Sequence, residues 1–179
     1  PRFEITSNVR IRQLYDVSPL GVIGMIGQGV ANGALISMAA VYAQQVGMTI
    51  AQTAWFAAAP LIGGFLLQWP IGRVSDHFDR RIVLTATAFA AAVFALLASA
   101  MTNTTSHLLQ LTAAALIGGV TLPQYSLCIA HTNDHLEPAQ MMAGSSTLTL
   151  LNSLGLIAGP TVAAVLMTNL DEQALFLAI

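Results

Sequence analysis

The segment GRVSDHFDRR, from Gly72 to Arg81, carries five of the fourteen charged residues of this 179-residue chain. No Asp, Glu, Lys or Arg occurs in the 56 residues from Val17 to Gly72, and charge-free runs of 52 and 33 residues follow the segment. Charged residues make up 8% of the chain, against about 25% in ordinary soluble domains. Because so few charges cannot cover a soluble surface, this distribution predicts helices surrounded by lipid.

The charge-free runs are long enough to cross a bilayer. A charged side chain at the bilayer centre costs about 2.5–3.5 kcal/mol, and a spanning helix needs about 20 apolar residues. The mean hydropathy is +0.71, and small residues are frequent, as in TATAFAAAVFALLASA from Thr85 to Ala100, which favours close helix packing in a membrane. A soluble all-helical protein would need helices with one charged face, which these runs lack. The sequence therefore predicts an all-α integral membrane protein.

Helix-start signals divide the runs into spans. Ser18 is a favoured N-cap before Pro19, and Thr49 with Gln52 forms the pattern of a capping box. Residues 1–18 are predicted to be a polar, cytoplasmic linker, followed by a transmembrane bundle over residues 19–179. Its predicted spans are residues 19–44, 50–69, 82–101, 108–130 and 139–168, with a truncated sixth helix at 173–179.

The arginines predict the orientation. All six basic residues are arginines, and each lies in the linker or between Gly72 and Arg81. An antiparallel bundle places these two segments on the same side of the membrane, and the opposite loops have no arginine. Positively charged residues are retained in the cytoplasm, so the N-terminal stretch is predicted to be cytoplasmic. The chain begins at Pro1 and ends within the apolar ALFLAI, and we expect it to be a piece of a longer protein.

The charged segment resembles a signature loop of the major facilitator superfamily, G-x-L-x-D-R-x-G-R-R-x-x-L, between the second and third helices of a six-helix half. The matching residues are Gly72, Val74, Asp76, Arg80, Arg81 and Leu84. His77 replaces the usual basic residue, and Asp79 stands where the family often has glycine, although Asp also tolerates turn conformations. The stretches LLQWPIGRVSDHFDRR, SPLGVIG and HTNDHL are most similar to the YcaD-type group of bacterial transporters.

This resemblance implies a fold and a function. It implies one six-helix half of a major facilitator bundle, the C-terminal one, with its last helix truncated, in a bacterial cytoplasmic membrane. The implied partners are the missing six-helix half, the lipid bilayer and a small solute of unknown identity. The implied activity is alternating-access transport of that solute without a cofactor. The alternative function is a non-transporting membrane module for assembly or sensing.

The resemblance also implies a conformational latch made of Gly72, Asp76, Arg80 and Arg81. Such a latch closes the cytoplasmic side and is released as the transporter changes conformation. The residue types suit this role, because glycine allows close helix approach, a carboxylate can meet a helix N-terminus, and arginine pairs with carboxylates. The alternative interpretation is a solvated turn whose arginines only set the orientation.

Two groups of residues within the spans are further candidates. Gly155, Gly159 and Pro160 resemble part of a motif in the fifth helix of facilitator halves, especially antiporters, but their spacing is also that of close helix packing with a proline kink. We predict helix packing for these three residues.

The second group consists of uncharged polar residues. The resemblance implies that the first and fourth helices line a substrate cavity. Gln28 and Asn32 lie near the middle of the first span, and Thr121, Gln124 and Tyr125 lie at comparable depth on the fourth, beside an expected proline kink. Such groups either hydrogen-bond neighbouring helices or line a cavity for a small neutral, polar or amphipathic solute.

Other chemistries have little support in the sequence. His131, Asp134 and His135 in HTNDH could suggest a metal site, but metal binding needs three or four convergent ligands. We predict a cytoplasmic turn without a metal there, in which Asp134 can contribute to the latch. The spans contain no catalytic triad and no glycine-rich nucleotide loop, so no enzyme is predicted. The net charge of −2 argues against a nucleic-acid partner.

Overall fold

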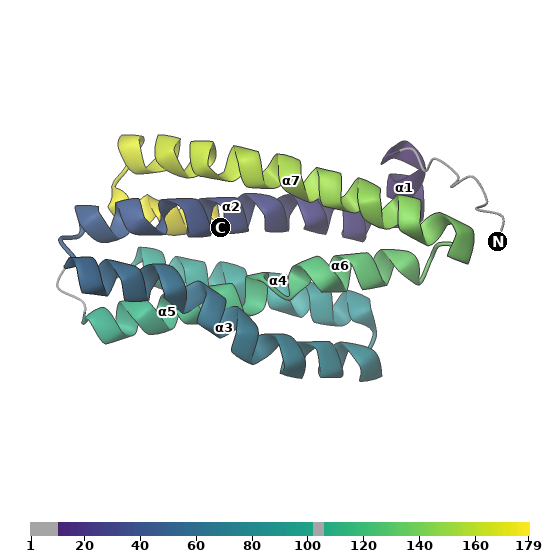
Figure 1. The fold of residues 1–179 in the computed structure, drawn as a ribbon, viewed down its shortest axis with the longest axis horizontal. Helices are drawn as coiled ribbons and strands as arrows, with labels where there is room; N and C mark the ends of the chain where they lie inside the picture. The colour runs from purple at the N-terminus through teal and green to yellow at the C-terminus, as the bar shows by residue number, and fades with distance from the viewer. Residues whose placement is uncertain (1–10, 102–105) are drawn as a thin grey trace.

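The computed structural model describes residues 11–101 and 106–179, and every regular element in these two ranges is a helix. Figure 1 shows the long helices running side by side along the longest axis of the molecule. The elements are α1 (Ile11–Val17), α2 (Pro19–Gln45), α3 (Ile50–His77), α4 (Arg80–Ser99), α5 (His107–Thr121), α6 (Gln124–Asn133), α7 (Pro138–Asn169) and the 3-10 helix η1 (Glu172–Ala178).

Five helical segments of the described chain are long and apolar enough to cross a membrane: α2, α3, α4, α5 with α6, and α7. Each of them exposes large apolar side chains, such as Phe65 on α3 and Ile157 on α7, which are 81% and 73% exposed. Water would disfavour so much exposed apolar surface, whereas lipid does not. The prediction of an all-α integral membrane protein is therefore confirmed.

The end of α3 differs from the prediction. The helix continues to His77 instead of ending near Trp69, and it contains Pro60 and Pro70. A proline is tolerated inside a membrane helix because neighbouring groups satisfy the carbonyl that it leaves free. The chain becomes extended only at Phe78, whose φ is −116° and ψ 163°. The charged segment is thus the end of one helix and the start of the next rather than a ten-residue loop.

The predicted helix starts are partly present. The capping box is confirmed, because Gln52 N donates to Thr49 Oγ1 at 3.3 Å and Thr49 N donates to Gln52 Oε1 at 2.8 Å. Ser18 precedes α2, but its side chain makes no capping hydrogen bond and instead accepts one from Thr132 Oγ1 at 3.3 Å. The predicted linker contains the short helix α1, and residues 1–10 lie outside the described ranges.

The fourth and sixth predicted helices both change form. The fourth is interrupted at Leu122 and Pro123, between α5 and α6, because proline has no N–H to continue the helix, and this confirms the expected kink. The sixth is described as the 3-10 helix η1, whose N-cap Asp171 accepts from Ala174 N at 3.1 Å. Its Phe176 packs edge-on against Tyr42 of α2, with ring centroids 5.2 Å apart, so it folds back onto the bundle.

Glycines bring α2 and α7 into backbone contact. A Cβ added to Gly155 would lie 2.5 Å from Ile26 O, and one added to Gly159 would lie 2.4 Å from Val30 O. Because real Cβ atoms do not approach other atoms so closely, only glycine fits at these two positions of α7. Figure 1 shows the two helices side by side along their lengths. Pro160, the third residue of this group, lies inside α7 without ending it.

Candidate functional site

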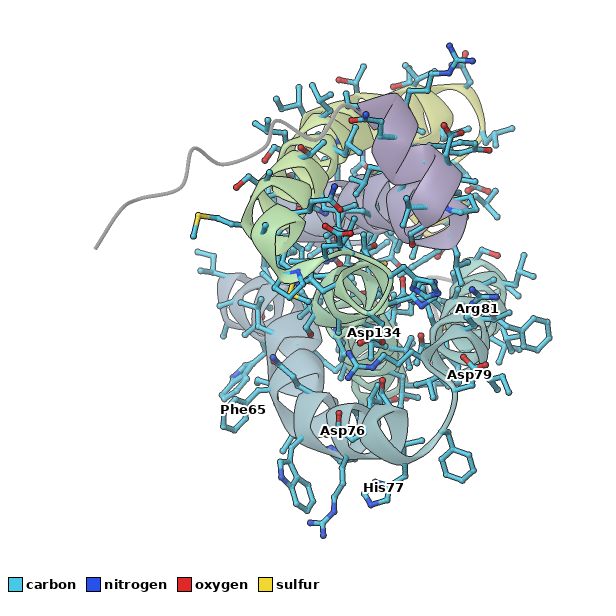
Figure 2. The ribbon with its side chains drawn as sticks, turned by 90° about the vertical axis from the view of Figure 1, so that its right-hand side faces the viewer. Phe65, Asp76, His77, Asp79, Arg81 and Asp134 are labelled. Carbon is cyan, nitrogen blue, oxygen red and sulfur yellow. The ribbon has the colours of Figure 1, made fainter. Side chains whose placement is uncertain are left out.

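Charged side chains gather at the end of the bundle where α3, α4 and α6 meet, the end that faces the viewer in Figure 2. Arg80, at the start of α4, lies between two carboxylates. Its Nε is 3.2 Å from Oδ2 of Asp134, the C-cap of α6, and its Nη2 is 3.8 Å from Oδ1 of Asp76 on α3. One guanidinium therefore links three helices. We call the whole group the charged cluster, which comprises Asp76, Asp79, Arg80, Arg81, Asp134 and His135.

Asp79 caps α4. Its Oδ1 accepts a hydrogen bond from Arg81 N at 2.9 Å, and a carboxylate is favourable beside the free N–H groups and positive dipole of a helix start. Asp76, which the sequence suggests can meet the N-terminus of a neighbouring helix, lies 3.8 Å from Arg80 in this structure. The departure from the family pattern at Asp79 thus has a structural role, because it supplies the cap that begins α4.

Arg81 joins α4 to the turn after α6. Its Nη2 donates to His135 Nε2 at 3.1 Å. His135 Nδ1 lies 2.8 Å from the carbonyl oxygen of His131, and a carbonyl can only accept, so Nδ1 carries the proton. Nε2 of the neutral ring then has a free lone pair, which is the acceptor that the guanidinium requires. This contact therefore depends on His135 being neutral.

The charged cluster surrounds a cavity of about 400 Å³ that is open on one side. The Arg80 side chain is 29% exposed, whereas those of Asp134 and Asp76 are 50% and 71% exposed. Ion pairs that remain in contact with water contribute at most about 1 kcal/mol each. The pairs can therefore break and form again at small cost. The lining residues are Ser75, Asp76, Phe78, Asp79, Arg80, Arg81, His131, Asp134 and His135.

Gly72 takes no part in the contacts of the charged cluster. A Cβ added to it would meet no atom within 4 Å, so no described segment of this chain approaches it closely. The predicted close helix approach at this residue is absent within the described chain. Close approach of another helix to Gly72 stays a prediction, and that helix would belong to a part of the protein outside the described chain.

The predicted cavity residues lie inside the bundle. Gln28, Asn32, Thr121 and Gln124 are all buried, at 2–7% exposure, and only Tyr125 is partly exposed. Thr121 Oγ1 donates to the Ile117 carbonyl of its own helix at 3.0 Å, and two of the five residues have a partner on another helix. Gln28 Oε1 accepts a hydrogen bond from Asn152 Nδ2 of α7, and the Tyr125 hydroxyl is hydrogen-bonded to Thr149 Oγ1 of α7 at 3.0 Å. Gln28 thus connects α2 to α7. Its contact with Asn152 is a hydrogen bond to a neighbouring helix, which is one of the two roles considered for these amides.

Asn32 and Gln124 are different, because each has a buried polar atom without a partner. Among the described residues, no hydrogen bond reaches Asn32 Oδ1 on α2 or Gln124 Nε2 on α6. One atom is an acceptor and the other a donor. Unpaired buried polar atoms are rare and costly, so these two, together with Gln110 Oε1 on α5, are the described interior groups best suited to bind a polar solute or water.

Sequence reasoning missed Asn152 and the role of His135. Asn152 is a lone amide in a charge-free run, as Gln28 and Asn32 are, and it precedes Gly155 by one helical turn, so its type and spacing could have identified it. The partner of His135 could not be predicted from residue type and spacing, because Arg81 is 54 residues away in the sequence. His131 and His135 stack edge-on at 4.8 Å, and the described residues contain no group of three His, Cys, Asp or Glu able to hold a metal.

Comparison with known proteins decides the family. The family model described as Major Facilitator Superfamily matches residues 21–179. This chain belongs to the major facilitator superfamily. It is 31% identical over 175 residues to the "Uncharacterized MFS-type transporter YcaD" of Escherichia coli, both in strain K12 / DH10B and in strain HS of serotype O9:H4. The resemblance to the YcaD-type group is confirmed.

The aligned region covers 98% of this chain and 43% of the relative, so the chain spans less than half the length of the curated relatives that it matches. No solved structure matches it significantly. The described helices therefore correspond to part of a major facilitator helix bundle.

Proposed function

We propose that the chain is the C-terminal six-helix half of a secondary transporter, which carries a small solute across the bacterial inner membrane by alternating access. The family match and the transporter-type relatives support transport, and coverage of 43% of their length supports a half. The solute crosses without chemical change and without a cofactor. The missing half, the surrounding lipid and the solute are the partners.

The charged cluster carries this proposal. It lies at the end of the bundle where the described arginines Arg12, Arg73, Arg80 and Arg81 are placed, in α1 or beside the junction of α3 and α4. Its pairs are exposed to water and individually weak, as contacts that form in one state and part in another must be. In the proposed mechanism the cluster and Gly72 close the cytoplasmic side against the missing half, and they separate when the transporter opens inward.

A solute path within this half would pass Asn32 and Gln124, two of the three amides of the described chain that have an unpaired buried atom. Asn32 Oδ1 can accept a hydrogen bond and Gln124 Nε2 can donate one, which suits a small neutral solute with both donor and acceptor groups. Both residues are buried in the described state, at 4% and 7% exposure. The path must therefore open by movement of the helices around the break between α5 and α6.

The proposal is tested by a substrate screen with the full-length protein in lipid vesicles, repeated for Asp76→Asn. This change keeps the size of the side chain and removes its charge from Arg80. We expect a transported solute to be found, and we expect its uptake to fall by about fivefold, the effect of roughly 1 kcal/mol, while membrane insertion persists.

Asp16→Asn is the matched control, because Asp16 is an exposed carboxylate in α1 outside the charged cluster. Its uptake should remain at the unsubstituted level. If Asp76→Asn transports as well as Asp16→Asn, the cluster is only a solvated turn. If no solute moves in either direction, the transport proposal fails.

A further inference from the structure

His135 lies outside the family's loop pattern, yet among the described residues it makes one of two polar contacts that tie the end of α6 to the start of α4, beside the apolar packing of Leu84 with Leu127. The other contact, Arg80 with Asp134, is an ion pair between groups that keep their charges at neutral pH. The contact of Arg81 with His135 requires a neutral imidazole instead, because Nδ1 already donates to the His131 carbonyl and only Nε2 is left to accept. Histidine is the side chain whose charge ordinarily changes between pH 5 and 8.

Protonation has a defined local consequence. A proton on Nε2 removes the acceptor and places a cation 3.1 Å from the guanidinium of Arg81. Like charges at this distance repel, so the ring and the guanidinium must separate. The hydrogen bond to the His131 carbonyl survives, because Nδ1 remains a donor in both charge states. Protonation therefore breaks the contact between His135, which follows α6, and Arg81 of α4, while His135 stays bonded to His131.

The other charges near His135 do not replace this contact. Asp134 is occupied by Arg80, and Asp79 accepts from the backbone of Arg81. The helices α2 and α7, which also pack on α6, contain no Asp, Glu, Lys, Arg or His within their bounds. The titratable and charged groups around this end of α6, from every element that reaches it, are Asp16, Asp76, His77, Asp79, Arg80, Arg81, His131, Asp134 and Glu137.

We propose that His135 is a proton-sensitive contact of the charged cluster, which binds Arg81 at the start of α4 when neutral and releases Arg81 when protonated, so that the start of α4 moves away from the end of α6. Acidification of the cytoplasm would thereby favour the open state of the latch. This inference rests on the proposed latch for its physiological meaning. The movement itself is local and can be measured without a substrate.

The test uses the full-length protein in lipid vesicles, with its cysteines removed, including Cys128→Ala. Spin labels are attached at Ile82→Cys on α4, an exposed position, and at Glu137→Cys after α6. Electron paramagnetic resonance measures the distance between the labels at pH 8 and pH 5.5. Imidazole nitrogen signals in nuclear magnetic resonance spectra of the same protein report whether His135 is protonated. We expect a longer distance at pH 5.5 than at pH 8.

Three variants make the outcome specific. In His135→Gln the amide oxygen can still accept from Arg81 but does not titrate, so the pH-dependent lengthening should be lost. In His135→Lys the long distance should already be present at pH 8. His77→Gln is the matched control, because His77 Nδ1 contacts the carbonyl of Arg73 in its own helix at 2.8 Å and the described chain gives His77 no partner on another helix. This variant should lengthen as the unsubstituted protein does.

Two results would overturn the inference. One is a full pH-dependent lengthening in His135→Gln. The other is an unchanged distance in the unsubstituted protein at a pH where its imidazole signals, identified by their loss in His135→Gln, show that His135 is protonated. If transport is never found but the distance responds as expected, only the proposed function fails.

Discussion

Two asparagines in the same bundle interior are in opposite energetic situations. Asn152 Nδ2 donates to Gln28 Oε1 and lies 3.3 Å from the Met25 carbonyl oxygen, so its amide connects α7 to α2. Asn32 Oδ1 is buried with no partner in the described parts of the chain. An unpaired buried polar atom costs about 1–3 kcal/mol of stability. Residues that lower stability in this way are expected mainly where function requires them.

The substitutions Asn32→Leu and Asn152→Leu separate these two situations, because both replace an amide by an apolar group of similar size. Asn32→Leu should raise the melting temperature of the full-length protein, since it removes an unpaired polar atom, and should abolish transport. Asn152→Leu should lower the free energy of unfolding by about 1 kcal/mol, since Gln28 loses its partner. Thermal unfolding in detergent and uptake into vesicles measure the two effects. Equal destabilisation by both changes would show that Asn32 is merely structural.

At the scale of elements, the pairing of α2 with α7 depends on backbone contact. A Cβ on Gly159 would lie 2.4 Å from Val30 O and 2.6 Å from Ala34 N, and neither backbone atom can move without moving α2. Gly159→Ala should therefore lower the free energy of unfolding by about 1–3 kcal/mol, as overpacking does. Thermal unfolding of the full-length protein measures this loss.

Gly27→Ala on α2 is the matched control, because a Cβ there would meet nothing within 4 Å. Its melting temperature should stay the same or rise slightly, since alanine favours helix more than glycine does. If the two variants melt together, the contact between α2 and α7 is looser than the structure has it.

The elements also show which features a sequence can predict. The capping box of Thr49 and Gln52 was predictable because its two partners are three residues apart and its geometry is local. The end of α3 was not, because the charges that mark the membrane edge do not stop a helix, which continues until the backbone becomes extended at Phe78. The partnership of Asn152 with Gln28 joins residues 124 apart, and only the packing of α2 on α7 decides it.

At the scale of the whole molecule, the length of α3 fixes how the bundle must cross the membrane. Its 28 residues span about 40 Å at 1.5 Å per residue, more than the roughly 30 Å of a hydrocarbon core. We therefore expect its two ends to lie on opposite sides of the membrane. Figure 1 shows the end of α3 and the start of α4 at the same end of the bundle as α1. The arginines at that end predict that it is cytoplasmic.

Cysteine labelling of the full-length protein in a Cys128-free background tests this orientation. Ile50→Cys at the start of α3, where the side chain is 92% exposed, should react with a membrane-impermeant thiol reagent added to the periplasmic side. His77→Cys at the other end should react only from the cytoplasmic side. Glu137→Cys is the control, because it follows α6 at the end of the bundle that also carries Asp134 and should label with His77→Cys. Labelling of Ile50→Cys and His77→Cys from one side would mean that α3 does not cross the bilayer, and the charged cluster could then not close one side of a transport path.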